Sequence, residues 1–235
     1  MKVYLINLDS EKKRFATADA QFKRLNVTFE RIPGVYGKKL QQKERDNAFN
    51  RFRWWCAVGR PVRDGEIGCA LSHYSIYKQM RDEPVCILED DVVLDSRFKE
   101  VLEYVEHQID IDKSQVILLS NHSKDIPKDN NIHIEHAKRD MYAEGYVITP
   151  KAAHALLKAN LPLQCPCDWW GRWVRRGVIE LYHAYPPVCS QNQAQYISGT
   201  VDVGCLRVSE LKWFRWLIHK GKRLIGKTID TLLPL

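Results

Sequence analysis

Short apolar runs alternate with segments of helical spacing along the first two-thirds of the chain. Between residues 11 and 25, apolar side chains recur every three or four positions, the period of one helix face: they are Phe15, Ala18, Phe22 and Leu25. The same patterns predict further helices over 65–80, 97–108 and 150–159, and strands over 2–8, 27–32, 85–88, 115–119 and 141–148. This alternation predicts an α/β fold with a largely parallel central sheet, in which ligands bind at the carboxyl ends of the strands.

Three consecutive acids, Glu89, Asp90 and Asp91, follow the apolar strand predicted over 85–88. Alternate side chains share a face at a strand end, so Glu89 and Asp91 are expected to converge while Asp90 turns toward a neighbour. Packed carboxylates repel one another unless a cation lies between them. Mg²⁺ or Mn²⁺, held by one or two carboxylates and a substrate diphosphate, fits this arrangement. The alternative is a solvated acidic turn without a ligand.

The composition is that of a folded globular protein, since 45% of the 235 residues are hydrophobic and 28% are charged. This balance excludes a disordered or collagen-like chain, and the length fits one domain with a small appendage. The net charge of +7 is concentrated at one end, because residues 207–235 carry +5 and residues 1–206 only +2. We therefore expect a nearly neutral domain followed by a basic tail. Within the domain, the polar residues 38–53 are expected to form a helix or a lid-like excursion.

The basic tail separates apolar from basic side chains when it is placed on a helix. A helix with Trp and Phe on one side and Lys and Arg on the other is typical of a segment lying in the headgroup plane of a membrane. The residues expected to contact an anionic membrane surface are Trp213, Phe214, Leu217, Lys220 and Arg223. Docking of the apolar face on the domain is the alternative. The segregation of the two faces disfavours a third reading, a basic nucleic-acid-binding module.

Seven cysteines are scattered along the chain without a CxxC pair. Cys69 and Cys86 lie within apolar runs, where a free cysteine behaves as a small hydrophobic residue. Cys165 and Cys167 are too close for an ordinary disulfide and lack a second pair for zinc. The chain starts directly with a strand pattern and shows no apolar leader segment. These features predict a reducing, cytoplasmic environment and a mature amino terminus at Met1.

Two longer motifs stand close together in the sequence. The string Gly65–His73 (GEIGCALSH) is followed about sixteen residues later by the acids of Ile87–Asp91 (ILEDD). Together they resemble glycosyltransferase family 25, the bacterial lipooligosaccharide galactosyltransferases and their collagen-modifying relatives. The similarity runs from residue 1 to about residue 200, because shorter stretches agree in the same order: Ile6–Leu8, Gly145–Ile148 and Pro186–Val188.

The resemblance implies a GT-A-like (Rossmann-like) nucleotide-sugar transferase fold for a catalytic domain over residues 1–206, with the C-terminal amphipathic helix of residues 207–235 as a membrane-associating tail. It implies an inverting transfer of galactose from UDP-galactose to a saccharide acceptor of lipooligosaccharide or lipopolysaccharide, with Mn²⁺ or Mg²⁺ as cofactor. Glu89 and Asp91 correspond to the metal site of the family. The implied donor-binding residues are Asn7, Leu8, Arg14, Ser72, His73 and Asp90.

Two of these donor-binding assignments have structural alternatives. Arg14 is either a bidentate phosphate partner or a surface cation beside Lys12 and Lys13. His73 either contacts the donor or serves the packing of its helix. Ser72 and His73 are both expected to point into the donor pocket.

An inverting transfer needs a general base, and a carboxylate near the acceptor hydroxyl is the usual solution. Asp168 is the candidate, because it matches an acid that the family places before an aromatic residue. Trp169 and Trp170 offer ring faces on which acceptor sugars can stack. The alternative role for Asp168 is to cap the helix predicted through Trp173. His183 and Gln191 are candidates for a third metal ligand.

The expected partners are a UDP-sugar donor, a lipid-linked oligosaccharide acceptor and an anionic membrane surface, and no nucleic acid is expected. The expected location is the cytoplasm, with peripheral attachment to the inner face of the cytoplasmic membrane. Alternatives are a transferase that uses UDP-glucose or another UDP-hexose, and a Mg²⁺-dependent phosphohydrolase. The sequence does not choose the donor hexose, because these sugars differ by single hydroxyl or acyl contacts.

Overall fold

The computed structural model of the chain describes residues 1–122 and 131–191. In this part, a seven-stranded sheet has the order β2-β1-β3-β7-β5-β8-β6, and β4 and β9 form a separate pair. The strands are β1 (Lys2–Asn7), β2 (Glu30–Pro33), β3 (Val85–Glu89), β4 (Val92–Leu94), β5 (Gln115–Leu118), β6 (His133–Ala137), β7 (Gly145–Ile148), β8 (Glu180–Tyr185) and β9 (Cys189–Gln191).

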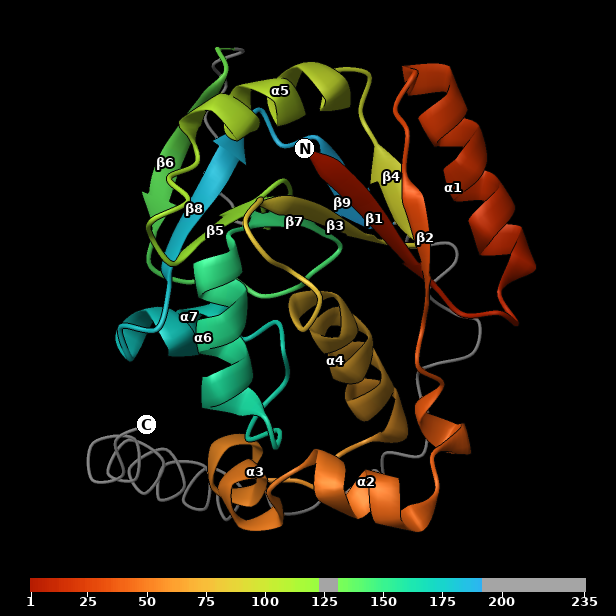
Figure 1. Cartoon of the computed structure of the whole chain (residues 1–235), viewed down its shortest axis with the longest axis vertical. Helices are drawn as coiled ribbons and strands as arrows, with labels where there is room; N and C mark the ends of the chain where they lie inside the picture. Colours follow the sequence, from red (N-terminus) through yellow and green to blue (C-terminus); the bar gives the residue numbers. More distant parts are fainter. Residues whose placement is uncertain (123–130, 192–235) are drawn as a thin grey trace, which may run out of the picture.

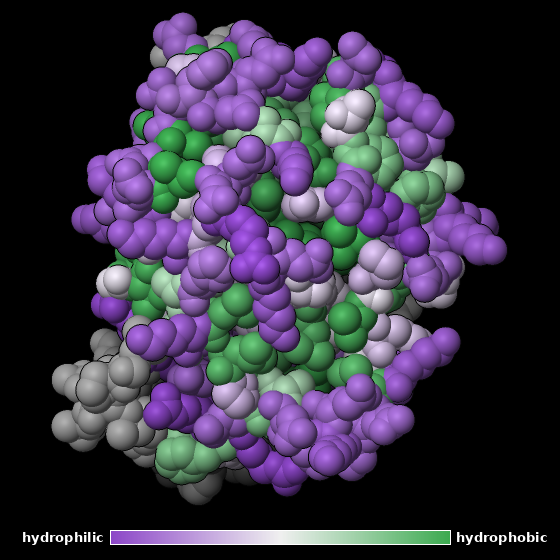
Figure 2. All heavy atoms as spheres, viewed as in Figure 1, coloured by the Kyte–Doolittle hydropathy of each residue, from purple (hydrophilic) through white to green (hydrophobic). Residues whose placement is uncertain are grey.

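Helices cover both faces of the sheet, as an α/β layer architecture requires (Figure 1). On one face, α1 (Lys12–Leu25) and α5 (Phe98–Gln108) bury a core cluster that contains Phe22 and Phe98. On the other face, α4 (Asp64–Tyr77), α6 (Pro150–Asn160) and α7 (Trp170–Arg175) bury a second cluster that contains Tyr74, Trp170 and Trp173. Hydrophilic residues form most of the rim of the molecule in the view of Figure 2, and hydrophobic residues gather near the centre.

Five of the seven strands in the sheet point the same way, and β7 and β6 run against them. The α/β class and the mostly parallel sheet predicted from the sequence are therefore confirmed. The carboxyl ends of β1, β3, β5 and β8 lie along one edge, where the start of the antiparallel β7 also lies. This edge is where an α/β sheet binds ligands.

The predicted elements differ from the structure mainly where the chain is polar. The strand predicted over 27–32 begins only at Glu30, because α1 ends with Asn26 in the left-handed conformation (φ 51°). The polar stretch 38–53 contains a 3₁₀ turn (Gly37–Lys39), α2 (Gln42–Ala48) and the start of α3 (Arg51–Val58). The strands β4, β6, β8 and β9 were not predicted from the sequence, because they are short or contain several polar residues.

The string GEIGCALSH forms most of α4 and owes part of its pattern to packing. A Cβ atom at Gly68 would lie only 2.4 Å from Val35 O, so glycine lets the segment after β2 approach the helix closely. Ser72 Oγ donates to Gly68 O and accepts from Val35 N at 2.8 Å. Glu66 caps the start of α4 by accepting from Arg63 N. Gly68, Ser72 and Glu66 therefore fasten α4 to the segments before it.

The predicted tail (207–235), with Trp213, Phe214, Leu217, Lys220 and Arg223, lies outside the described residues, as does the domain boundary at residue 206. Most of the polar loop over 121–131 also lies outside them. Among the described residues, no helix combines the length and apolarity needed to cross a membrane.

Candidate active site

Asn7, the first of the predicted site residues, lies at the edge of the sheet where the parallel strands end. The ends of β1 and β3 lie side by side, because Ile6 pairs with Glu89 in a parallel register. Asn7 Nδ2 donates to Asp90 Oδ2 at 2.6 Å, and Asn7 Oδ1 accepts from Arg31 Nε at 2.9 Å. Asn7 is buried and therefore orients Asp90 from the neighbouring strand. Leu8 follows at the same edge and is half-buried.

Arg14 reaches the acidic run from α1. Its Nη1 donates to Asp90 Oδ1 at 3.3 Å and lies 3.9 Å from Asp91 Oδ2. The side chain is only 12% exposed, so Arg14 is not the surface cation that the sequence left as an alternative. Burial raises the pKa of Asp90, while the hydrogen bond from Asn7 and the charge of Arg14 act in the opposite direction. Arg14 therefore partly neutralises two adjacent carboxylates.

Asp91 has one paired oxygen and one buried oxygen without a partner among the described residues. Gln191 Nε2, on β9, donates to Asp91 Oδ2 at 3.1 Å, whereas Asp91 Oδ1 has no hydrogen-bond donor. Burial, and then the charge of Glu89, raise the pKa of Asp91 to about 6. A buried carboxylate oxygen of this kind is satisfied by a divalent cation with oxygen ligands. The residues present therefore fit a cation at Asp91, with Gln191 orienting the carboxylate.

Glu89 contacts two residues of α4. Its Oε1 lies 3.1 Å from His73 Nε2 and 3.7 Å from Cys69 Sγ. Burial raises the pKa of Glu89, but the hydrogen bond and the charge of His73 outweigh it and lower the pKa. Burial by itself would lower the pKa of His73. The hydrogen bonds of His73 to Cys69 and Glu89 outweigh burial and raise the pKa to about 10. A buried imidazolium–carboxylate pair therefore forms at neutral pH.

The side chains of the three acids do not point to alternating sides, as they would in a continuous strand. Asp91 shares Arg14 with Asp90, while Glu89 pairs with His73, because the chain turns at residues 90 and 91. Asp90 turns toward Asn7 on the neighbouring strand, as expected, whereas Glu89 and Asp91 contact different partners. The charge of Glu89 still raises the pKa of Asp91, which indicates that the two carboxyl groups lie within electrostatic range.

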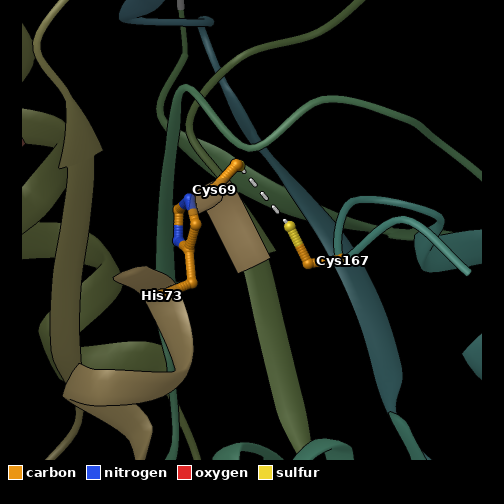
Figure 3. Close-up of side chains that lie close together, drawn as sticks. All are labelled: Cys69, His73 and Cys167. Atoms are coloured by element: carbon orange, nitrogen blue, oxygen red, sulfur yellow. Dashed lines mark hydrogen bonds between the residues drawn. The ribbon is translucent and has the colours of Figure 1, made fainter. Parts of the chain in front are cut away.

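Two cysteines and a histidine, two of which contact Glu89, lie close together. Figure 3 shows the side chains of Cys69, His73 and Cys167. Cys69 and His73 lie on α4, and Cys167 lies on the segment before α7; their ligand atoms are all within 4.8 Å of one another. The sulfur atoms of Cys69 and Cys167 are 3.7 Å apart. Cys69 is exposed, so the expectation that it acts as a small buried hydrophobic residue is wrong, whereas Cys86 is buried as expected.

Asp168 lies at the same edge, next to Cys167. Its Oδ2 accepts from Tyr142 N at 3.2 Å, and the N-cap position of α7 is Trp169, so Asp168 does not cap that helix. Burial, and then the charge of Glu89, raise the pKa of Asp168 to about 6. The carboxylate is therefore mostly ionised at neutral pH and more basic than an ordinary aspartate, as a general base requires.

The two tryptophans that follow Asp168 have different positions. Trp170 is 1% exposed, donates from Nε1 to Tyr142 O at 2.8 Å and packs edge-on against Tyr146. It is a core residue, and the structure contradicts the stacking role predicted for it because no ring face is open. Trp169 is half-buried and remains a candidate for contact with an acceptor sugar.

Three other predicted site residues are engaged in contacts with neighbouring residues of the chain. The hydroxyl of Ser72 binds Gly68 and Val35, so it positions α4 instead of pointing into a donor pocket. His183, a candidate third metal ligand, has its Nε2 2.9 Å from Asp140 Oδ2. Gln191, the other candidate, contacts Asp91 through its amide nitrogen.

Sequence reasoning missed several residues at this edge. Tyr142 has a left-handed backbone (φ 76°), and it contacts Asp168 through its N–H and Trp170 through its carbonyl. The buried Glu144 pairs with His122. These residues come from loops that show no periodic pattern. The pair of Cys69 and His73, four residues apart in one helix, was a visible signal, but its partner Cys167 is 98 residues away.

Comparisons with known proteins bear on the family of this chain. The model of "Glycosyltransferase family 25 (LPS biosynthesis protein)" matches residues 1–170. A procollagen galactosyltransferase 1-B from Xenopus laevis is 29% identical over 174 residues, which are 68% of this chain and 28% of that protein. A glycosyltransferase 25 family member from Anopheles gambiae is 28% identical over 243 residues, covering 89% of this chain and 40% of its own length.

A Haemophilus influenzae protein, named as a glycosyltransferase, is 28% identical over 174 residues, or 70% of this chain and 60% of that protein. The chain thus spans between 28% and 60% of the length of these relatives. The family match and the names of the relatives support an enzyme of the glycosyltransferase class. Because the family model covers well over half of its residues, the chain belongs to glycosyltransferase family 25.

Proposed function

We propose that the chain is an inverting, metal-dependent transferase that moves galactose from UDP-galactose to a saccharide acceptor of lipooligosaccharide or lipopolysaccharide. One observation carries the proposal: at the carboxyl edge of the sheet, the buried Asp91 lies near Arg14 and keeps its Oδ1 without a hydrogen-bond partner among the described residues, and Asp168 lies within the electrostatic range of Glu89. An anionic donor needs cations at such an edge, and an acceptor hydroxyl needs a base.

The donor diphosphate is proposed to lie over the ends of β1 and β3. Arg14 presents its guanidinium there, and Asn7 holds Asp90 so that the guanidinium keeps its position. Asp91 is the residue best suited to hold Mn²⁺ or Mg²⁺, and Glu89 is the second predicted ligand. A bound cation neutralises the charge that develops on the departing diphosphate.

Asp168 is proposed to act as the general base. The carboxylate accepts the proton of the acceptor hydroxyl while the hydroxyl oxygen forms the new bond to the anomeric carbon and the bond from that carbon to UDP breaks on the opposite side. Tyr142 N donates to Asp168 Oδ2 and so fixes the direction of the carboxylate. Trp169 borders the same segment and is proposed to stack on the acceptor sugar.

The choice of galactose and of the acceptor rests on the names of family and relatives. The family description names lipopolysaccharide biosynthesis, and the Xenopus laevis relative is named a procollagen galactosyltransferase. A GT-A-like fold agrees with the mostly parallel sheet and the acids at its carboxyl edge. Attachment of the basic tail to the inner face of the cytoplasmic membrane suits a lipid-linked oligosaccharide acceptor.

A panel of UDP-sugars tests the proposal. The full chain is incubated with UDP-galactose, UDP-glucose or a UDP-N-acetylhexosamine, with Mn²⁺ or with a chelator, and UDP release is measured with and without an oligosaccharide acceptor. We expect release from UDP-galactose that depends on both Mn²⁺ and the acceptor. Faster release from UDP-glucose would reassign the donor. Phosphate release from simple phosphoesters without any sugar transfer would instead indicate the phosphohydrolase alternative.

A further inference from the structure

We propose that Cys69, Cys167 and His73 form a binding site for a zinc ion, distinct from the cation proposed at Asp91. The sequence argued against zinc because the chain has no paired CxxC motifs. The fold supplies the ligands from two separate segments: α4 and the segment before α7. The site does not depend on the proposed transfer reaction.

The sulfur atoms have the spacing that one tetrahedral zinc ion imposes. Two thiolates, each about 2.3 Å from the metal, lie about 3.8 Å apart at the tetrahedral angle. Cys69 Sγ and Cys167 Sγ are 3.7 Å apart. A disulfide needs sulfur atoms about 2.05 Å apart, so the observed spacing suits a shared metal better than a direct bond.

His73 supplies the third ligand, since its ring nitrogen and the two sulfur atoms all lie within 4.8 Å of one another. Glu89 lies beside this group, with its Oε1 3.1 Å from His73 Nε2 and 3.7 Å from Cys69 Sγ. Two sulfurs and one nitrogen form a donor set that zinc favours over Mg²⁺ or Ca²⁺, and three protein ligands leave the fourth position of the ion for water or another ligand.

The far side of the imidazole is also arranged as in metal sites. A zinc-bound histidine usually uses its second ring nitrogen to bond a fixed polar group, which sets the ring orientation. His73 Nδ1 is 2.7 Å from the buried hydroxyl of Tyr146, which in turn is 2.6 Å from the hydroxyl of Tyr77. This chain of hydroxyls leaves Nε2 facing the two sulfur atoms and Glu89.

A zinc ion at this site would join the segments that carry the candidate active site. Cys167 immediately precedes Asp168, and Glu89 immediately precedes Asp90. Coordination would displace the protons of the two thiols and of His73, so binding weakens as the pH falls. The proposed zinc ion has sulfur and nitrogen ligands, whereas the cation proposed at Asp91 has oxygen ligands.

Cobalt titration of the full chain tests the site, because Co²⁺ replaces zinc and reports its ligands by absorption. The reduced, metal-free protein is titrated with Co²⁺, followed by Zn²⁺, without donor or acceptor. We expect one equivalent of Co²⁺ to produce a sulfur-to-cobalt charge-transfer band and strong tetrahedral d–d bands, and Zn²⁺ to remove both. Loss of a residue that only orients a metal ligand typically lowers metal affinity by roughly 10–100-fold. Cys69→Ser and Cys167→Ser should each lower the affinity for Co²⁺ by more than this.

Cys56→Ser is the matched control, because Cys56 is a half-buried cysteine outside the cluster and the variant should bind like the parent chain. Circular dichroism of each variant separates lost binding from lost folding. The proposal is overturned if the parent chain gives no charge-transfer band, or if the Cys69→Ser/Cys167→Ser double variant keeps it. Formation of a Cys69–Cys167 disulfide without metal uptake would also overturn it and identify a redox pair.

Discussion

The two sides of one three-residue acidic run carry different chemistry. On the α4 side, Glu89 meets the imidazole of His73 and the thiol of Cys69, beside the thiol of Cys167. On the α1 side, Asp90 and Asp91 meet nitrogen donors of Asn7, Arg14 and Gln191 within the described part of the chain. The first set suits a soft metal, and the second suits a hard cation and a diphosphate.

The difference shows that neighbours decide the behaviour of like residues. All three acids are largely buried, yet the pKa of Glu89 is lowered by His73, whereas the pKa values of Asp90 and Asp91 are raised by burial. One full positive charge faces Glu89, while Arg14 is divided between the other two acids. The α1 side is therefore left with excess negative charge that a cation would relieve.

The largest expected effect is that of Asp168→Asn. The amide keeps the shape of the side chain but cannot accept a proton, so kcat should fall by roughly 10²–10⁴-fold, the usual contribution of a general base. UDP binding, measured by calorimetry, should stay unchanged because Asp168 is not proposed to contact the donor. Wild-type kcat in a folded Asp168→Asn variant would remove this residue from the mechanism.

The adjacent tryptophans should separate stability from acceptor binding. Trp170→Ala leaves a large cavity under α7 and should lower the free energy of unfolding by about 3–5 kcal/mol, measured by denaturant titration. Trp169→Ala should change stability much less and raise KM for the acceptor. Equal losses of stability in the two variants would contradict the distinction between a core residue and a binding residue.

Arg14→Gln should affect only the α1 side of the acidic run. Loss of charge-assisted hydrogen bonds of about 1.5–3 kcal/mol corresponds to donor binding that is roughly 10–100-fold weaker, measured as the Kd for UDP. Cobalt uptake at Cys69 and Cys167 should be nearly unchanged, because Arg14 is not one of the ligands. If cobalt affinity and UDP affinity fell together, the two sides would not be independent.

The smallest effect concerns pH. The pKa of Asp91 is raised from 3.8 to about 6 in the folded chain, so the folded state binds this proton more tightly than the unfolded state. The resulting stabilisation is present at low pH and is lost as the pH rises through about 6. The free energy of unfolding is measured with a chelator present, for the parent chain and for Asp91→Asn. Lowering the pH from 7.5 to 5.5 should raise it in the parent chain, relative to the variant, by about 1 kcal/mol, or about 2–4 °C in Tm. No pH dependence in this difference would show that Asp91 has an ordinary pKa.

The fold was predictable where periodicity is strong. Residues 12–25, 98–108 and 150–160 are helical close to the predicted bounds, and the apolar strand before Glu89 is present. The strand β6 was missed because its sequence, HIEHA, is largely polar and lies at an edge of the sheet. An edge strand does not need a regular alternation of apolar and polar residues. Its sequence therefore gives only a weak signal for a strand.

The candidate site was predictable at the strand ends and less so elsewhere. The acids after β3 and Asn7 after β1 follow from topology, because parallel strands bring their carboxyl ends together. The partnership of Cys69 with Cys167 depends on how the segment before α7 packs against α4, which local patterns do not encode. Trp170 was assigned to the acceptor because an aromatic residue in the core and one in a binding site look alike in sequence.

The central claim is that the α1 side of the acidic run holds the donor through a divalent cation at Asp91. The most direct measurement is the Kd of UDP for the full chain and for Asp91→Asn, by calorimetry, each with Mn²⁺ and with a chelator. We predict that Mn²⁺ strengthens UDP binding to the parent chain and has no such effect on the variant. Equal UDP binding by both proteins, with the same response to Mn²⁺, would contradict the account.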